Sequence, residues 1–299
     1  MAFASTLKGD VVSTNLSYAR KLFSHVLESS SEPFDADRLR QIEAHLTQLP
    51  VPAHGSRAYL DRHMPRLART LALVPPPRST SRILELGCYM QITSFLDRLC
   101  HYREVRGAYY GSAGGVDHKT VTFPDATFTC DIDLFNAELD RYPYPDGYFD
   151  CVVAGEIIEH FLHDPMHMLL ESHRILVEGG TLVITTPNVS SITSIAKTLS
   201  GHNPQIYSSY KRADPGEPLE IGHMREYTVK ELTEITVAAG YEIESIFTTF
   251  LPEYETHRSL LPWLELNGYS TEHRGQQIWC LARKRANRPV TRYPAFLYD

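Results

Sequence analysis

The sequence predicts an α/β protein with a mostly parallel sheet, and two stretches near its middle are the main reason. Residues 149–154 (FDCVVA) form a short apolar and β-branched run, as a strand buried on both faces requires. Residues 181–186 (TLVITT) form a second such run, and the segment between them has helical spacing. Parallel strands need a crossover of this kind, so the stretch is predicted to form one βαβ unit.

Asp164 and Pro165 are predicted to begin the crossover helix, with Asp as N-cap and Pro at the first helical position. Its buried face is predicted to carry Met168, Leu169, Ser172, Ile175 and Leu176. Gly179 and Gly180 are predicted to end the helix through left-handed conformations. Residues 155–163 then lie at the carboxyl end of the first strand, where open α/β sheets bind ligands.

Composition narrows the class of protein. The chain has 299 residues, 42% hydrophobic and 22% charged, which suits one large soluble α/β domain with an appendage. A formal charge of −7 offers no basic surface, so neither nucleic acid nor membrane is an expected partner. Five cysteines without a C-x-x-C pair, no leader and no long apolar stretch predict a cytoplasmic protein.

The predicted core is flanked by two further regions. Residues 1–77 show helical spacing at 15–29, 35–49 and 56–74, and three prolines end the region. We expect an N-terminal helical cap, either a layer packed on the sheet or a lid over a cofactor, and the two roles are compatible. Residues 78–285 form the core, and the basic, then aromatic tail 286–299 docks on another surface or another subunit, so a homo-oligomer is possible.

The chain resembles class I S-adenosylmethionine (SAM)-dependent methyltransferases in the stretch FDCVVAGEIIEHFLHDP, which is followed by ILVEGGTLVITTPN. Within that family it resembles in particular the ubiquinone-biosynthesis-like group, which has an EH..DP motif and acts on small molecules. The resemblance covers about residues 82–283. It implies a Rossmann-like seven-stranded sheet, with residues 241–250 and 276–283 as an antiparallel edge hairpin. It also implies SAM as cofactor and S-adenosyl-L-homocysteine as product.

The resemblance assigns the cofactor turn to the end of the strand 82–86. Glu85 matches the family acid and Gly87 the first glycine of E-L-G-x-G-x-G, where the backbone approaches the cofactor because glycine has no Cβ. Cys88 follows, Tyr89 stands at the second glycine's position, and no third glycine is present. Either cofactor binding is degraded, or a tyrosine-containing turn similar to that of some bacterial relatives replaces the glycines.

The resemblance also implies an acid at the end of the second strand, 104–110, that accepts hydrogen bonds from the ribose hydroxyls. Tyr109 and Tyr110 stand there instead, as replacement hydroxyls or as core aromatics. Asn136 and Ala137 occupy the adenine position, where the Asn136 amide offers an acceptor. Glu156, after the strand 149–154, is the remaining expected cofactor contact.

Methyl transfer needs alignment of the acceptor and, for a hydroxyl or amine, a base. His160 is the predicted base, unless it orders its loop by bonding to the backbone or to Glu156. Residues 223–228 (HMREYT) resemble the family's H-x-R-E-Y/F-T element, which makes His223 and Tyr227 the next catalytic candidates. Arg225 either joins them or pairs with Glu226 or Glu220. Thr228 and Glu231 predict a capping box for the helix 229–239.

A metal site is the alternative chemistry. Glu156, Glu159, His160 and His223 resemble the divalent-metal site of small-RNA 3′-end 2′-O-methyltransferases, where Mg²⁺ or Mn²⁺ activates a ribose hydroxyl. The acidic charge and the lack of an RNA-binding surface argue against it, so no metal ligand is assigned and Mg²⁺ is not favoured. His163, His167 and His173 are expected on the surface or on a helix face.

The sequence therefore predicts a SAM-dependent O- or N-methyltransferase acting on a small molecule, a saccharide or secondary metabolite by family analogy. The main alternative is a non-catalytic SAM-fold binding or scaffold protein, because the later glycines and the ribose acid are missing. A nicotinamide-dependent dehydrogenase is disfavoured, since it needs the same missing features and nothing else points to one.

Overall fold

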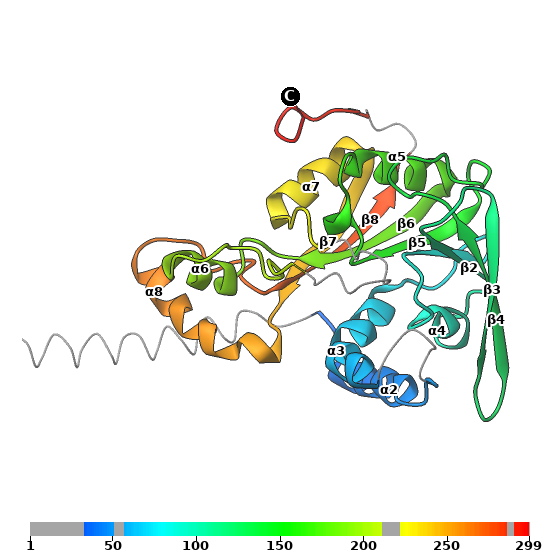
Figure 1. Ribbon diagram of the computed structural model, residues 1–299, viewed down its shortest axis with the longest axis horizontal. Helices are drawn as coiled ribbons and strands as arrows, with labels where there is room; N and C mark the ends of the chain where they lie inside the picture. The colour runs from blue at the N-terminus through cyan, green and yellow to red at the C-terminus, as the bar shows by residue number, and fades with distance from the viewer. Residues whose placement is uncertain (1–32, 51–56, 211–221, 286–289, 299) are drawn as a thin grey trace, which may run out of the picture.

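An eight-stranded sheet forms the centre of the molecule, in the order β3-β4-β2-β1-β5-β6-β8-β7 (Figure 1). This computed structural model describes residues 33–50, 57–210, 222–285 and 290–298, so the helix predicted at 15–29 lies outside the described residues. The strands are β1 (Arg82–Leu86), β2 (Glu104–Tyr109), β3 (Gly115–Thr122), β4 (Thr127–Leu134), β5 (Phe149–Gly155), β6 (Leu176–Pro187), β7 (Tyr241–Thr249) and β8 (Gln277–Lys284). The predicted α/β class is confirmed.

The strands run in the predicted directions, and the sheet has one strand more than predicted. Strands β4, β2, β1, β5 and β6 are parallel, while β8 runs antiparallel to both β6 and β7, which makes the predicted edge hairpin. At the opposite edge, β3 pairs antiparallel with β4 as an eighth strand that the sequence did not reveal. Its sequence, GVDHKTVT, is largely polar and solvent-facing, so it lacks the apolar alternation that marks a half-buried strand.

Helices cover both faces of the sheet (Figure 1). On one face lie α2 (Ala36–Leu46), α3 (Arg57–Leu73) and α4 (Thr93–Arg98), and on the other α5 (Pro165–Ile175) and α7 (Val229–Ala238). Strand β5 serves both cores, because alternate side chains point to opposite faces. Cys151 and Val153 pack with the α2–α3 layer, whereas Val152 and Ala154 pack with the α5–α7 layer.

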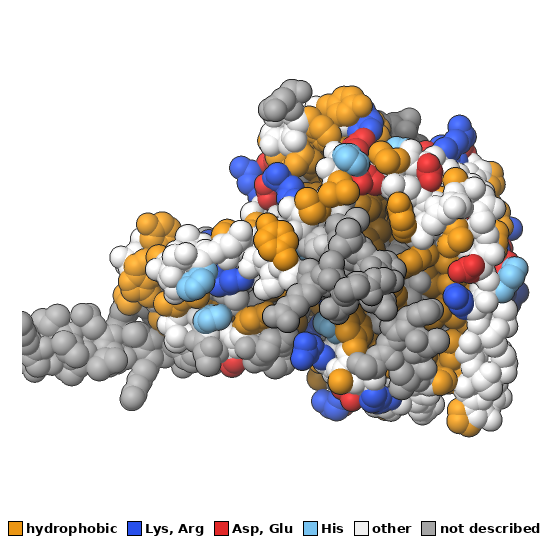
Figure 2. Space-filling view, in the orientation of Figure 1, with side chains coloured by type: hydrophobic (Ala, Val, Ile, Leu, Met, Phe, Trp, Pro, Cys, Tyr) orange, Lys and Arg blue, Asp and Glu red, His pale blue; other side chains and the backbone are white. Residues whose placement is uncertain are grey.

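A lobe projects beyond the sheet, at the left of Figure 1. It consists of α6 (Ile192–Leu199), the 3-10 segment η2 (Pro252–Leu260) and α8 (Leu261–Leu266), packed around Ile192, Leu261 and Leu264. Several of its apolar side chains are exposed, as Figure 2 shows for this lobe: Leu199, Trp263, Leu266 and Tyr269. Among the described residues, no helix is both long and apolar enough to cross a bilayer.

The crossover helix begins as predicted but ends earlier. Asp164 is the N-cap of α5 and accepts a hydrogen bond from the His167 backbone N–H at 3.3 Å. The helix stops at Ile175, and Gly179 and Gly180 lie within β6, so the prediction that they end the helix was wrong. They form a bulge instead: the register between β5 and β6 shifts there, and Gly179 has φ +72°.

Asp150 attaches the segment before β1 to the sheet. Its buried carboxylate accepts hydrogen bonds from the backbone N–H groups of Ser79, Thr80 and Arg82 at 2.9–3.2 Å, and from two hydroxyls. Burial alone would raise the pKa of Asp150, but these bonds outweigh it and lower the pKa to about 2. The ionised carboxylate therefore contributes to the stability of the fold.

Replacing Asp150 by Asn should lower the free energy of unfolding by roughly 2–3 kcal/mol at pH 7, because an amide cannot satisfy five donors. Asp146→Asn is the matched control, since Asp146 is 75% exposed and pairs only with Arg174 at the surface. The lowered pKa means that the wild-type contribution is complete above about pH 4 and is lost as the pH falls towards about 2. Urea unfolding at pH 7 and pH 3 measures both effects, and equal losses in the two variants would contradict this role.

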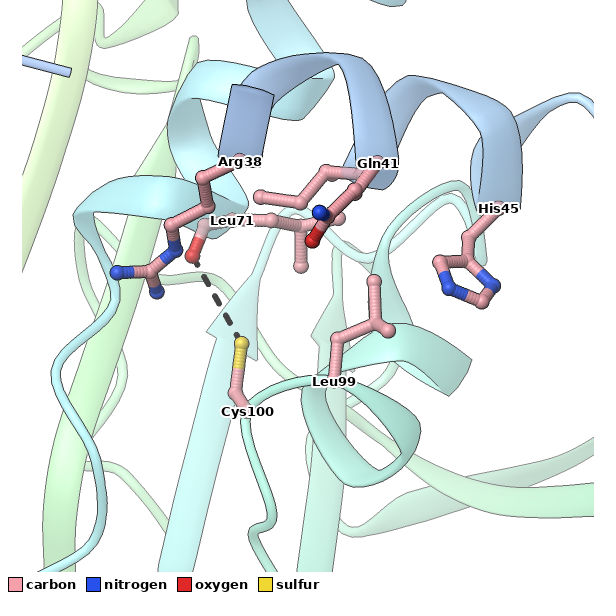
Figure 3. Close-up of a pocket in the computed structure, with 7 residues that line it drawn as sticks. Arg38, Gln41, His45, Leu71, Leu99 and Cys100 are labelled. Atoms are coloured by element: carbon pink, nitrogen blue, oxygen red, sulfur yellow. Dashed lines mark hydrogen bonds between the residues drawn. The ribbon is translucent and has the colours of Figure 1, made fainter. Parts of the chain in front are cut away.

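A cavity of about 150 Å³ lies within the helical layer around α2 (Figure 3). The Cys100 thiol donates a weak hydrogen bond to the Leu71 carbonyl at its base. The lining residues are Arg38, Gln41, Ile42, His45, Leu71, Leu99 and Cys100. None of them lies at the carboxyl ends of the parallel strands, so this cavity is separate from the candidate site described next.

Candidate functional site

The site lies where β1, β2 and β5 end. Strand β1 is hydrogen-bonded to β2 on one side and to β5 on the other, all parallel. The loops that follow these strands therefore meet at one edge of the sheet, the edge at which α/β sheets bind ligands. Most of the residues singled out in the sequence lie on these loops or on the segment 222–227.

Gly87 makes the turn after β1 and touches the loop after β5. Its φ is +71°, and a Cβ atom placed there would lie 2.4 Å from Cγ2 of Ile157. Only glycine fits both the backbone conformation and this contact. The predicted cofactor turn is therefore packed directly against the segment that carries Glu156, Glu159 and His160.

The residues on either side of Leu86 and Gly87, which are Glu85 and Cys88, have buried side chains. Glu85 is buried and accepts a hydrogen bond from the Thr93 hydroxyl at 2.6 Å, and burial raises its pKa to about 7. The Cys88 thiol is also buried, 3.3 Å from the same hydroxyl. Both side chains thus hold the start of α4 against β1, and Tyr89, 55% exposed, is the first side chain of the turn that faces solvent.

Tyr89 and Tyr109 meet across the ends of β1 and β2. The Tyr109 hydroxyl donates to the Tyr89 hydroxyl at 3.0 Å, and the rings pack edge to face with centroids 5.1 Å apart. Tyr109 is 38% exposed and Tyr110 is 76% exposed, so neither is a core aromatic. The strand end at which the family places a ribose acid carries phenol hydroxyls on an open surface.

Asn136 and Ala137 follow β4, at the same edge. The Asn136 side-chain oxygen accepts from the Glu138 backbone N–H at 2.9 Å, and the Ala137 carbonyl accepts from the Tyr142 hydroxyl at 2.9 Å. The turn is fixed by these bonds. An amide oxygen has a second lone pair, so Asn136 keeps capacity to accept one more hydrogen bond.

Glu156 ends β5 with φ +55°, and its carboxylate is held towards β6 and β8. Oε1 accepts from the Thr185 hydroxyl and from the Gln277 side-chain amide, both at 2.7 Å. The predicted alternative bond between Glu156 and His160 is not formed. His160 lies one turn further, at the end of the 3-10 turn η1 (Ile158–His160), and its Nδ1 donates to the Gly222 carbonyl at 3.1 Å.

Glu159, His160 and His223 form one cluster, with a carboxylate oxygen and two ring nitrogens all within 4.8 Å of one another. Glu159 is fully buried; Oε2 accepts from the Thr186 hydroxyl at 2.9 Å, while Oε1 has no hydrogen-bond partner among the described residues. Burial, and then the negative charge of Glu156, raise the pKa of Glu159 well above its usual range. The backbone N–H groups of Met224 and Arg225 donate to the Glu159 carbonyl, which holds the two segments together.

The two imidazoles are bonded to the protein through the same ring nitrogen. His160 donates from Nδ1 to a carbonyl, and His223 donates from Nδ1 to Oε1 of Glu226 at 3.0 Å. A neutral imidazole has one protonated nitrogen, so both rings carry their lone pair on Nε2. The rings stand perpendicular with centroids 4.8 Å apart. The cluster thus offers two basic nitrogens beside a buried carboxyl group.

Known proteins resemble this chain in sequence and in fold. The family model described as "Methyltransferase domain" matches residues 57–246. The chain belongs to this methyltransferase family. Probable S-adenosylmethionine-dependent methyltransferases of Mycolicibacterium smegmatis and Mycobacterium tuberculosis are 31% identical over 148 residues and 30% identical over 166 residues.

The alignments cover 50% of this chain and 47% of the M. smegmatis relative, and 55% of this chain and 50% of the M. tuberculosis relative. The chain thus spans about half the length of the curated relatives it matches. A methyltransferase structure from Mesorhizobium loti aligns over 75% of this chain and 98% of its own, with 16% identity and a TM-score of 0.42. One from Archaeoglobus fulgidus aligns over 77% and 95%, with 18% identity and a TM-score of 0.46.

The side chains of two other residues of the HMREYT element make their contacts outside the imidazole cluster. Tyr227 is 2% exposed and belongs to the α5–α7 core, where burial raises the pKa of its phenol. Arg225 pairs with Glu231 at 2.7 Å, so the predicted pair with Glu226 is not formed, and Glu220 lies outside the described residues. Thr228 and Glu231 form the predicted capping box of α7.

The C-terminal segment docks on its own chain, beside the site loop. Arg292 and Tyr298 both bind the carboxylate of Asp164, the N-cap of α5, and the Tyr298 hydroxyl donates to it at 2.5 Å. Leu297 and Tyr298 pack against the α5–α7 core. The sequence predicted only that an aromatic tail docks on some surface. In the structure that surface is the start of α5, the helix that follows His160.

The sequence did not reveal Glu226 as a member of the candidate site. It suggested this residue only as a partner for Arg225. Its position three residues after His223 was the available signal, because a side chain in a tight turn can reach back over that distance. Ile157, which contacts the Gly87 turn, carried no signal, since an apolar residue in an apolar run looks like ordinary core.

Proposed function

We propose that this methyltransferase uses SAM to methylate a hydroxyl or amine of a small molecule, with a saccharide or secondary metabolite as the first class of acceptor. The observation that carries the proposal is the pair of imidazoles beside the Gly87 turn. Both rings hold Nδ1–H in bonds to the protein, which leaves Nε2 as the basic atom. A scaffold protein has no need of two oriented bases at the ligand edge of its sheet.

His160 is the proposed general base. The acceptor oxygen or nitrogen attacks the methyl carbon in line with the carbon–sulfur bond, and the electron pair of that bond stays on sulfur, which gives S-adenosyl-L-homocysteine. The acceptor loses its proton to Nε2 of His160 as the new bond to carbon forms. His223, perpendicular to His160, is the proposed second group at the acceptor. Tyr227, the third predicted catalytic residue, is buried in the α5–α7 core.

The cofactor site is proposed at the turns after β1, β2 and β4. The turn of Gly87, Cys88 and Tyr89, braced by Glu85, would lie against the methionine part of SAM. The hydroxyls of Tyr89, Tyr109 and Tyr110 would take the place of the ribose acid, and Asn136 with Ala137 would meet the adenine. Glu156 would border the methionine end. Residues 1–77 are proposed as the helical cap, 78–285 as the catalytic core with 189–228 on the acceptor side, and 286–299 as the tail.

Titration calorimetry of the full chain with SAM and with S-adenosyl-L-homocysteine tests the cofactor site directly. Micromolar binding is expected for both. Methyl-labelled SAM offered with a panel of small hydroxyl and amine compounds then tests transfer. Failure to bind either compound at millimolar concentration would contradict the proposal and would favour the alternative, a non-catalytic protein with a methyltransferase fold.

A second candidate function is a metal-dependent transfer to a ribose-like hydroxyl, and Oε1 of Glu159 is the observation that favours it. A fully buried carboxylate oxygen without a partner, next to two imidazoles whose Nδ1–H groups are already bonded, matches the needs of a divalent metal. Glu159, His160 and His223 would be the ligands, while Glu156 is turned towards Thr185 and Gln277. Such an ion, when bound, would lower the pKa of an acceptor hydroxyl.

Titration of the protein with Mn²⁺, followed by the relaxation of water protons or by calorimetry, tests the metal site without turnover. If the site holds a metal, Glu159→Gln should weaken binding at least about tenfold, whereas Glu156→Gln should leave it unchanged. Equal effects of the two variants, or no binding by the wild type, would contradict the metal site. Because burial raises the pKa of Glu159 and so favours its neutral form when no cation is present, its Gln variant should keep the wild-type stability.

A further inference from the structure

Glu226 is a fully buried carboxyl group of the site, and no arginine or lysine among the described residues is bonded to it. Its side chain is 0% exposed, and Arg225, next to it in the sequence, pairs with Glu231 instead. Three donors converge on its two oxygens. Oε2 accepts from the Ile206 backbone N–H at 2.7 Å, and Oε1 accepts from the Tyr207 backbone N–H at 2.9 Å and from Nδ1 of His223 at 3.0 Å.

These bonds join two parts of the chain that the sequence separates. Ile206 and Tyr207 belong to the segment after α6, on the acceptor side of the site, whereas His223 belongs to the imidazole cluster. The Tyr207 ring also packs against the His223 ring, with centroids 4.9 Å apart. Lys197 of α6 holds the same segment from its other side, by donating to the carbonyls of Gln205 and Ile206.

The hydrogen bonds of Glu226 determine the tautomer of His223. Both oxygens of Glu226 accept backbone N–H bonds, and Oε1 is the atom that faces His223, so the ring nitrogen on that side carries the proton. The lone pair of His223 is then fixed on Nε2, the atom left for the site. Buried carboxylates that bind an imidazole in this way are known to fix both its tautomer and its orientation.

We infer that Glu226 is the positioning residue of this methyltransferase, which fixes His223 with its lone pair on Nε2 and couples that state to the ordering of the acceptor-side segment at Ile206 and Tyr207. This inference rests on the proposed function in one respect, that His223 works at the reacting centre. When the segment leaves Glu226, the carboxylate loses two of its three donors and His223 loses its fixed neighbour. The ordering of the segment at Ile206 and Tyr207 and the fixed tautomer of His223 therefore form together.

The nitrogen NMR signals of the histidine rings test the first part without cofactor or acceptor, with a His223→Asn variant to assign the His223 signals. The wild type should show His223 as the Nδ1–H tautomer. Glu226→Ala should convert it largely to the Nε2–H tautomer, whereas Glu255→Gln, a change at an exposed ion pair, should leave it unchanged. A wild-type Nε2–H tautomer, or an Nδ1–H tautomer retained in Glu226→Ala, would overturn the inference.

Amide hydrogen exchange tests the coupling, and Glu226→Gln serves here because it keeps the side-chain volume if Glu226→Ala does not fold. One Gln oxygen cannot serve three donors, so the amides of Ile206 and Tyr207 should exchange roughly ten- to hundredfold faster. Unchanged exchange would overturn the coupling. With an acceptor in hand, Glu226→Gln should lower kcat at least about tenfold with the KM for SAM unchanged, and Glu226→Asp should restore part of it. These NMR and exchange results stand even if no acceptor is methylated, which separates this inference from the proposed function.

Discussion

Gly87→Ala should reduce SAM affinity by at least about 100-fold, the largest expected effect of a single methyl group in this protein. The added Cβ meets two obstacles. The backbone at φ +71° is strained for any L-residue, by about 1–2 kcal/mol, and the Cβ would lie 2.4 Å from Cγ2 of Ile157. Relieving the strain or the collision requires the turn after β1 or the loop after β5 to move. Both segments border the proposed cofactor site. Titration calorimetry with SAM measures the loss.

Gly114→Ala is the matched control, because Gly114 has φ +84° but nothing within 4 Å of the added Cβ. It should cost stability through strain alone and leave SAM affinity unchanged. Ile157→Ala supplies a second test: combined with Gly87→Ala, it removes the colliding atom and should recover part of the affinity. If Gly87→Ala binds SAM like the wild type, the cofactor does not depend on this turn.

The contact between Gly87 and Ile157 also marks the limit of what the sequence could predict. Residues 149–154 and 181–186 were recognisable as strands because burial on both faces demands a continuous apolar run, and Asp164-Pro165 because capping is local. These patterns depend on neighbours in the chain. The contact of Gly87 depends on β1 lying beside β5, which no local pattern encodes.

The same distinction explains the errors. Gly179 and Gly180 fit the pattern of a helix end, but the pairing of β6 with β5 places them in a bulge. Strand β3 is stabilised almost entirely by its pairing with β4, so its own sequence carries little signal. In the site, the residues His160 and His223 were predictable as reactive types, whereas their orientation comes from Gly222 and Glu226 through bonds formed in the folded chain.

Two carboxylates of the site illustrate how position, rather than residue type, sets the chemistry. Glu159 is buried beside Glu156 with one oxygen unpaired, and both conditions favour its neutral form at neutral pH. Glu226 is equally buried, yet both of its oxygens accept hydrogen bonds, from two backbone N–H groups and from the His223 ring. The site thus places a carboxyl group with a raised pKa next to the imidazoles, and behind His223 a carboxyl group whose two oxygens both accept hydrogen bonds.

His160→Gln should lower kcat for methyl transfer by about 10²–10⁴-fold, the usual contribution of a general base, while SAM affinity stays at the wild-type value. Glutamine retains a hydrogen-bonding side chain that can reach the Gly222 carbonyl, so the loop should keep its place, but its amide cannot take up a proton. His163→Gln is the control, because His163 lies on the same loop, is exposed, and takes no part in the cluster. Initial rates with methyl-labelled SAM and an acceptor found in the panel measure the effect. A His160→Gln variant as active as His163→Gln would remove His160 from the role of base and leave His223 as the nitrogen that accepts the proton.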